Sequence, residues 1–222
     1  MSWDFETDAE FQKELDWIDQ FVRNEVEPLD HILGSPYDIH NPRNHKLVRP
    51  LQAEVRKHKL WACHLGPELG GPGYGQLKLA LMNEILGRSR FAPTVFGTQA
   101  PDTGNSEILA HYGTPEQKQK YLTPLLNNEI VSCFSMTEPH AGADPKMFTC
   151  RADLKGDFWV INGEKWFSSN ARYSSFLIAM VVTDPDAPPY QKMSMFLVPT
   201  DTPGVNIIRN VGLGTEHAED GE

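Results

Sequence analysis

Two short stretches in the second half of the sequence carry residue types that suit a ligand site. The first covers residues 134–144 and reads Phe-Ser-Met-Thr-Glu-Pro-His-Ala-Gly-Ala-Asp. Its Pro, Ala and Gly residues predict a turn at which backbone N–H groups can approach a ligand, because no large side chain stands in the way. This geometry favours an anion. The stretch therefore predicts an anion-binding turn that follows an apolar strand.

The second stretch covers residues 161–170 and reads Ile-Asn-Gly-Glu-Lys-Trp-Phe-Ser-Ser-Asn. Its Asn-Gly pair predicts a hairpin turn, and the turn would place two aromatic and two hydroxyl side chains on one ribbon. Each stretch also has an ordinary interpretation on its own. A Thr-Glu-Pro turn can simply end a strand, and Asn-Gly is common in hairpins.

Together, and in this order, the two stretches resemble the acyl-CoA dehydrogenase family. Residues 136–144 are similar to its flavin signature, Met/Val-Thr-Glu-Pro-x-x-Gly-Ser-Asp, and residues 165–169 are similar to the strand that faces the flavin ring. The resemblance covers essentially the whole chain. It is closest to the subgroup of family members ten and eleven, through residues 99–105 and 165–169.

The resemblance implies FAD as the cofactor, because desaturation of an acyl thioester needs a hydride acceptor that no side chain provides. It places the Met136 backbone and the Thr137 hydroxyl at the pyrimidine end of the flavin, and the Ser169 hydroxyl near the reactive N5. The sequence departs from the family pattern at Ala143, where a hydroxyl residue is usual. The cofactor-binding residues implied in this way are Phe134, Met136, Thr137, Gly142, Ala143, Phe167, Ser168 and Ser169.

The same resemblance assigns Gln99, Asp102 and Thr103 to a region that lines the acyl-chain cavity. An alternative is that Asp102 and Thr103 cap the helix that follows. We interpret the carboxylates of Glu138 and Asp144 as acceptors of backbone N–H bonds that hold the turn. No catalytic base is assigned, because the family takes its base from a C-terminal helical domain, which we expect beyond Glu222.

The implied reaction is α,β-dehydrogenation of an acyl-CoA in fatty acid β-oxidation, with electrons passed to an electron-transfer flavoprotein. The full-length protein would form homodimers or homotetramers, and this chain alone would be an incomplete portion. Two alternatives stay open. One is a flavin-dependent monooxygenase or acyl-CoA oxidase on the same scaffold, and the other is a non-catalytic module for acyl binding or assembly.

The elements that must position these residues change type near residue 129, so the pattern predicts an α+β fold. Residues 1–129 show helical spacing and form a predicted all-α domain, whereas residues 130–222 form a predicted antiparallel β-barrel or sandwich. Residues 66–75 are too rich in Gly and Pro for a helix or strand, and the family resemblance implies a structural turn there. A phosphate-binding loop is the alternative, which the missing Gly-Lys-Ser/Thr ending disfavours. Predicted helices cover residues 8–27, 77–86, 94–112 and 114–127, and a further predicted helix has Pro50 near its first turn. Predicted strands cover residues 131–137, 149–155, 158–161, 165–169, 176–183, 193–199 and 205–209.

The composition argues against several classes of partner. A net charge of −10 disfavours nucleic acid and anionic membranes, which both require clustered Lys and Arg. The three cysteines show no paired spacing and predict buried apolar side chains, and the eight histidines show no metal-ligand spacing. No run is long enough to span a membrane. We therefore predict a cytoplasmic enzyme of bacterial type, without a targeting signal or a bound metal.

Overall fold

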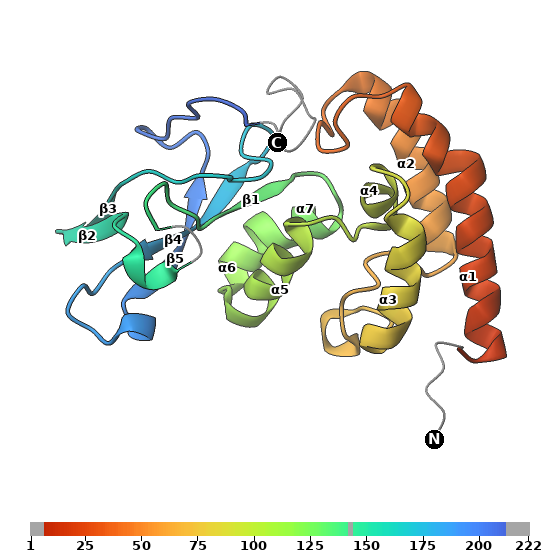
Figure 1. Ribbon diagram of the computed structural model, residues 1–222, viewed down its shortest axis with the longest axis horizontal. Coiled ribbons are helices and arrows are strands. Elements are labelled where there is room, and N and C mark those ends of the chain that lie inside the picture. The colour runs from red at the N-terminus through yellow and green to blue at the C-terminus, as the bar shows by residue number, and fades with distance from the viewer. Residues whose placement is uncertain (1–6, 142–143, 212–222) are drawn as a thin grey trace. The chain divides into compact units, whose positions relative to one another are not determined.

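The computed structural model describes residues 7–141 and 144–211 (Figure 1). The chain divides into two compact units, Met1–Glu129 and Ile130–Glu222, which are described separately here. Among the described residues, the α-helices lie in the first unit, and the strands and two short 3-10 helices, Pro145–Met147 and Pro189–Gln191, lie in the second. The predicted α+β class is therefore confirmed.

The first helix of the helical unit, α1, covers Ala9–Phe21. The side chain of Asp8 caps it by accepting a hydrogen bond from the Phe11 N–H at 2.8 Å. The chain then continues as a π-helical turn, Val22–Val26, and a 3-10 turn, Glu27–His31. Pro28 lies inside this last turn, so helical conformation extends beyond residue 27, where the first helix was predicted to end.

The second helix, α2, covers Pro42–Lys57. Its N-cap is Asn41, whose side-chain oxygen accepts from the N–H groups of Arg43 and Asn44. Pro50 therefore lies in the interior of the helix, and its predicted place near the first turn is wrong. The start signal is Asn41 followed by a proline at the first helical position, where a missing N–H costs nothing.

The remaining helices are short. Gly97, with φ of 67°, ends α4, so the helix predicted over 94–112 is two helices joined by a loop. Thr114 caps the segment that follows, and the reciprocal bonds of a capping box join it to Gln117. The bounds are Gly75–Leu86 for α3, Ala92–Phe96 for α4, Asp102–Tyr112 for α5, Pro115–Gln117 for α6, Lys118–Leu122 for a π-helical turn and Thr123–Leu126 for α7.

An apolar core joins the first part of the helical unit. Side chains of α1, α2, α3 and α4, the helices so labelled in Figure 1, contribute to it. Its members recur at helical spacing along the sequence, as the pattern predicts. They include Phe11, Leu15, Ile18, Val22, Val26, Val55, Leu60, Met82, Leu86, Phe91 and Phe96.

The described residues of the β unit, 130–141 and 144–211, form one mixed sheet. Its order is β1-β4-β2-β3, with β5 paired to β4. β1 and β2 run parallel to β4, whereas β3 and β5 run antiparallel to their neighbours. The predicted antiparallel barrel or sandwich is therefore corrected to an open mixed sheet. The strands are Ser132–Ser135 for β1, Arg151–Lys155 for β2, Phe158–Asn162 for β3, Phe176–Val182 for β4 and Met193–Pro199 for β5.

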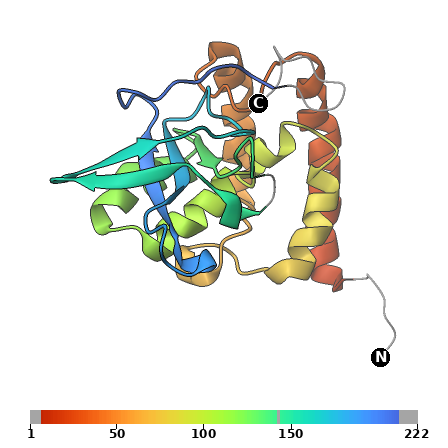
Figure 2. The ribbon, with the colours of Figure 1, turned by 60° about the vertical axis from the view of Figure 1, so that its left-hand side comes forward.

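Two of the predicted strands, 165–169 and 205–209, are irregular in the structure. The Asn-Gly pair is not a hairpin turn, because Asn162 still belongs to β3. A Cβ on Gly163 would lie 2.5 Å from the Cβ of Cys150, so this glycine permits a close approach of two chain segments. The hairpin turn instead lies between β2 and β3, at Gly156, with φ of 62°, and Asp157. Figure 2 shows these two strands projecting side by side.

Cys63, Cys133 and Cys150 are free and buried, as predicted. Within residues 7–141 and 144–211, no group of three His, Cys, Asp or Glu side chains could hold a metal ion. None of the described helices is long and apolar enough to cross a membrane.

Candidate functional site

The two stretches that suit a ligand site meet in the β unit. The Trp166 N–H donates a hydrogen bond of 2.8 Å to the carbonyl oxygen of Thr137. Two residues away on each segment, the hydroxyls of Ser135 and Ser168 lie 2.7 Å apart and share a hydrogen bond. These contacts hold the end of β1 and its turn beside the segment that follows β3.

A buried ion pair also joins the two stretches. The Lys165 ammonium donates 2.8 Å bonds to the Met136 carbonyl and to Glu138 Oε1. The side chains of Lys165 and Glu138 are only 12% and 3% exposed, respectively. The ammonium also lies 4.4 Å from the centroid of the Phe148 ring, a cation–π distance. The Lys165 ammonium is therefore held by three contacts. Met136 and Glu138 belong to the turn that resembles a flavin signature, and Phe148 lies just before β2.

Glu138 completes this arrangement by binding the backbone that leads into β2. Its Oε2 accepts 2.6 Å and 3.1 Å bonds from the N–H and the hydroxyl of Thr149, and its Oε1 accepts from the Cys150 N–H at 3.1 Å. Burial alone would raise the pKa of Glu138, but Lys165 and the two backbone N–H groups outweigh it and lower that pKa. We call Met136, Glu138, Thr149, Cys150 and Lys165 the Glu138 network.

The segment after Lys165 is irregular because two of its residues adopt left-handed backbone angles. Phe167 has φ of 51° and Asn170 has φ of 69°. A strand cannot pass through such residues, so the neighbouring side chains do not alternate across a sheet. As a result the rings of Trp166 and Phe167 are 41% and 51% exposed and meet edge to face at 5.4 Å. Trp166 therefore lies outside the buried core.

Hydroxyl groups with unused hydrogen-bonding capacity lie on the same two stretches. Thr137 and Ser169 are half-buried, and no hydrogen bond to either side-chain hydroxyl is found among the residues that the structure describes. Asn170 is fully buried, and its side-chain amide has no partner within that same part of the chain. Exposed aromatic rings beside free hydroxyls fit a flat ring with a polar edge, and an isoalloxazine has this character.

The other predicted cofactor residues lie on or near these stretches. Phe134 lies on β1, paired with Ile178 of β4, and is half-buried. Gly142 and Ala143 lie outside the described residues. Asp144 is exposed and accepts a 3.0 Å bond from the Lys146 N–H, so its carboxylate holds a local turn. The structure thus joins the two segments at three points, through Met136 with Lys165, Thr137 with Trp166 and Ser168 with Ser135. Phe167 and Ser169 lie on the same segment as Ser168.

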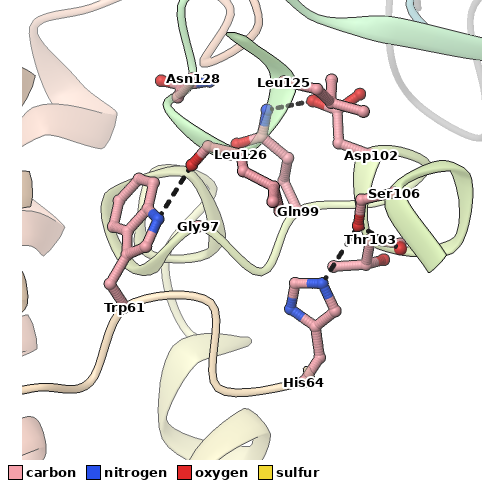
Figure 3. Close-up of a pocket in the computed structure, with 10 residues that line it drawn as sticks. All are labelled: Trp61, His64, Gly97, Gln99, Asp102, Thr103, Ser106, Leu125, Leu126 and Asn128. Carbon is pink, nitrogen blue, oxygen red and sulfur yellow. Dashed lines mark hydrogen bonds between the residues drawn. The ribbon is translucent and has the colours of Figure 1, made fainter. Parts of the chain in front are cut away.

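The predicted substrate residues lie in the helical unit, around a small pocket shown in Figure 3. Gln99 and Asp102 are buried, and the Gln99 amide donates a 2.7 Å bond to the Asp102 carboxylate. Thr103 is half-buried, and its carbonyl accepts from Ser106 Oγ at 2.7 Å. The pocket volume is about 20 Å³, enough for roughly one water molecule. Pro101 occupies the N-cap of α5 without a side-chain cap bond, and Asp102 begins the helix.

His64 adds a further polar group to this pocket that the sequence did not reveal. Its Nε2 lies 3.4 Å from Ser106 Oγ, and its Nδ1 is buried without a partner among the described residues. Burial lowers the pKa of His64 to about 4. The imidazole is therefore neutral at pH 7. Because Ser106 Oγ already donates to the Thr103 carbonyl, His64 Nε2 is the donor toward Ser106 Oγ and Nδ1 is an acceptor. His64 Nδ1 and Gln99 Oε1 thus line the pocket as acceptors unpaired within the described part of the chain.

Sequence reasoning missed Lys165 and Ser135 as structural members of the site. A lysine placed directly before two aromatic residues is the one signal for the first, because a charge in an apolar run needs a buried partner. Nothing in the local sequence signals that Ser135 pairs with a residue 33 positions away.

Comparisons with known proteins match the chain in two parts. Residues 8–129 match the N-terminal domain of acyl-CoA dehydrogenases, and residues 133–222 match the middle domain of the same family. The two matched regions correspond to the helical and the β unit.

Individual relatives agree. Chicken (Gallus gallus) "Acyl-CoA dehydrogenase family member 11" is 39% identical over 86% of this chain and 26% of its own length. Mouse (Mus musculus) "Acyl-CoA dehydrogenase family member 10" is 37% identical over 86% of this chain and 19% of its own length. A solved structure from Mycobacterium abscessus, assigned to the acyl-CoA dehydrogenases, superposes with a TM-score of 0.80 at 36% identity, over 93% of this chain and 54% of its own. The chain thus spans between about a fifth and a half of these relatives.

Proposed function

The chain belongs to the acyl-CoA dehydrogenase family, and from this premise we propose that it forms part of an FAD-dependent enzyme that dehydrogenates an acyl-CoA at its α,β-bond. The observation that carries the proposal is the meeting of residues 134–138 with residues 165–169. The contact presents two unpaired hydroxyls and two exposed aromatic rings on adjacent segments. This surface fits a flavin better than it fits an ordinary strand end.

The residues proposed to hold FAD divide by the chemistry they offer. Thr137 and Ser169 offer hydroxyls that can both donate to and accept from the polar edge of the ring. Phe134, Phe167 and the backbone of Met136 offer apolar or amide contacts, and Gly142 and Ala143 are proposed to meet the pyrophosphate. When bound, FAD supplies the acceptor for the hydride that leaves the β-carbon. Ser168 is held by Ser135 and fixes the segment between these contacts.

We propose that the proton acceptor of the reaction does not come from Glu138 or Asp144. The Glu138 carboxylate already accepts bonds from Lys165, Thr149 and Cys150, and its lowered pKa makes it a weak base. Asp144 is used by a local turn. These contacts support a base that lies in another part of the family's full-length chain.

We propose that Gln99, Asp102 and Thr103 contact the substrate. The support is the buried pocket that they border and the unpaired acceptor of Gln99. A polar acceptor that stays unpaired costs about 1–3 kcal/mol, so a bound group or water that donates to it is favoured. The pocket volume suits one polar group rather than a length of alkyl chain.

The whole enzyme is proposed to pass its electrons to an electron-transfer flavoprotein and to work as a homodimer or homotetramer in fatty acid β-oxidation. These parts of the proposal rest on the family alone. The relatives are two to five times longer than this chain.

The test is a titration of the purified chain with FAD, followed by flavin fluorescence and the visible spectrum. We expect saturable binding that Thr137→Ala and Ser169→Ala each weaken about five- to tenfold, because each variant removes one hydrogen bond to the ligand. Thr202→Ala is the matched control, since Thr202 is exposed in a turn after β5.

Equal FAD affinity for wild type, Thr137→Ala and Ser169→Ala would remove these residues from the site. Saturable binding followed by rapid reoxidation of the reduced flavin by oxygen would favour an oxidase or monooxygenase over a dehydrogenase.

A further inference from the structure

We propose that Lys165 is a positioning residue, which fixes the backbone at Met136 and Thr137 against residues 165–169 so that the hydroxyls of Thr137 and Ser169 are presented together. The inference rests on the proposed function for the identity of the ligand. It assigns a role to a side chain that contacts other protein groups and not the reacting atoms.

The first argument is connectivity. Lys165 is next in sequence to Trp166, whose N–H binds the Thr137 carbonyl, and its own ammonium binds the carbonyl of the preceding residue, Met136. Two consecutive carbonyls of the turn are therefore bound by two consecutive residues of the other segment. Neither carbonyl belongs to a strand, so these two bonds replace the ladder that would otherwise set the register.

The second argument is the anchoring of the ammonium itself. Glu138 binds Lys165 and, through its other contacts, the N–H groups of Thr149 and Cys150 at the entrance of β2. The Val182 N–H donates in turn to the Cys150 carbonyl, which ties that entrance to the end of β4. These bonds fix the position of Lys165 relative to β2 and β4 of the sheet, and not only relative to its own loop.

The third argument is that residues 165–169 have little else to hold them. Phe167 is exposed and left-handed, and Asn170 is left-handed. Among the described residues, the Ser168 side chain bonds to Ser135 alone, and the backbone bonds from Ser169 to Phe167 and from Ala171 to Ser168 stay within the segment or next to it. A segment with few buried apolar contacts and few backbone bonds opens locally at low cost. Loss of the Lys165 contacts should therefore loosen this segment while the sheet stays folded.

The experiment compares amide hydrogen exchange of the chain without flavin in wild type, Lys165→Met and Lys165→Arg. The Trp166 amide is the reporter, since it donates to Thr137. We expect Lys165→Met to speed its exchange at least about tenfold and to be partly rescued by Lys165→Arg, which keeps a charged donor. The β4 amides should stay near wild type, because in Lys165→Met the Glu138 carboxylate keeps its bonds from the Thr149 N–H, the Thr149 hydroxyl and the Cys150 N–H. Lys155→Met is the matched control, because Lys155 is an exposed lysine of the same unit.

FAD titration of the same variants supplies the second readout. We expect Lys165→Met to weaken FAD binding at least about tenfold and to change the shape of the bound-flavin absorption band, whereas Lys155→Met leaves both unchanged. A merely stabilising role would lower the protection of the β4 amides as well and would leave the affinity of the folded fraction intact.

The two measurements separate the two claims. Unchanged exchange at Trp166 in Lys165→Met overturns the positioning role, whatever the flavin does. Faster exchange across the whole β unit overturns it in favour of a structural role. Failure of the wild-type chain to bind FAD counts against the proposed function, and in that case the exchange result still decides whether Lys165 positions the two segments.

Discussion

The capping bonds of the helical unit and the Glu138 network of the β unit act at different distances along the sequence. In the helical unit, the capping bonds join residues two or three positions apart, such as Asp8 with Phe11 and Thr114 with Gln117. In the β unit, Glu138 reaches 11 positions to Thr149 and 27 positions to Lys165. Short-range bonds stabilise an element that would start there anyway, whereas the long-range bonds determine which segments meet.

The Glu138 network and the pocket of the helical unit differ in how completely their buried polar groups are paired. The Glu138 network satisfies its carboxylate with N–H, O–H and ammonium donors. The pocket of the helical unit instead leaves His64 Nδ1 and Gln99 Oε1 without partners in the part of the chain that the structure describes. A fully paired cluster fixes a structure, and a cluster with spare acceptors has capacity for another molecule.

The largest effect should come from breaking the paired cluster. Glu138→Leu leaves the Lys165 ammonium buried without its carboxylate and two backbone N–H groups unpaired. We expect it to lower the free energy of unfolding of the β unit by about 3–5 kcal/mol, the usual cost of breaking a buried pair. Hydrogen exchange of the β4 amides measures that energy, and Glu164→Leu, an exposed glutamate nearby, is the control.

The double variant Glu138→Leu with Lys165→Met sharpens this prediction. Removal of both charges takes away the uncompensated ammonium, so the double variant should be more stable than Glu138→Leu alone. Additive losses would mean that the two side chains act independently and that the pairing is not the source of the effect.

Much of the helical unit could be predicted from sequence, because apolar spacing, N-caps and prolines act within one or two turns. The core residues of α1 and the cap at Thr114 are examples. The interior position of Pro50 was missed, since helical spacing beyond the proline looked like a fresh start. Contacts across the unit, such as Arg49 with the carbonyls of Asn127 and Asn128, leave no local signal.

The candidate site was predicted in its residue types but not in its geometry. The family resemblance pointed to residues 134–144 and 165–169, and the structure joins them. The hairpin expected at Asn162 was wrong, because Gly163 is needed for the close approach to Cys150. The strand expected over 165–169 was wrong, because the left-handed angle of Phe167 depends on contacts far away in sequence. Neither constraint is visible in a local pattern.

A second, smaller effect concerns the pocket of the helical unit. His64 should make the free energy of unfolding of this unit depend on pH. The pKa of His64 is lowered to about 4 from an ordinary value near 6.5. Between these two pH values, His64 is protonated in the unfolded chain and neutral in the folded unit. Stability from this group is therefore complete above about pH 7 and is lost as the pH falls towards 4. The loss should approach about 3 kcal/mol for the helical unit.

The measurement is the unfolding free energy of the helical unit, from exchange of its core amides, between pH 4 and 7. His64→Gln should flatten the pH dependence, whereas His40→Gln, at an exposed histidine of the same unit, should keep it. If the unfolding free energy of His64→Gln depends on pH as steeply as that of wild type, other groups cause the dependence. The proposal that the His64 imidazole is buried in its neutral form would then lose its support.

The smallest effect tests the short-range side of the comparison, at the start of α6. Thr114→Ala removes the hydroxyl that accepts the Gln117 N–H, and it leaves the Gln117 side chain bound only to the Thr114 backbone N–H. We expect a loss of about 1 kcal/mol, the usual value for an N-cap. Thr123→Ala, at an exposed position within the helical segment that follows, should instead gain a few tenths of a kcal/mol, because alanine has the higher helix propensity. Opposite signs for two Thr→Ala changes nine positions apart would show that capping and not side-chain loss is measured.

Because both bonds of the capping box are local, the loss should be confined to amides of the helical unit and should leave the Trp166 amide of the β unit unchanged. A change at Trp166 in Thr114→Ala would mean that the two units do not unfold independently, and that the long-range network of the β unit also carries part of the stability of the helices.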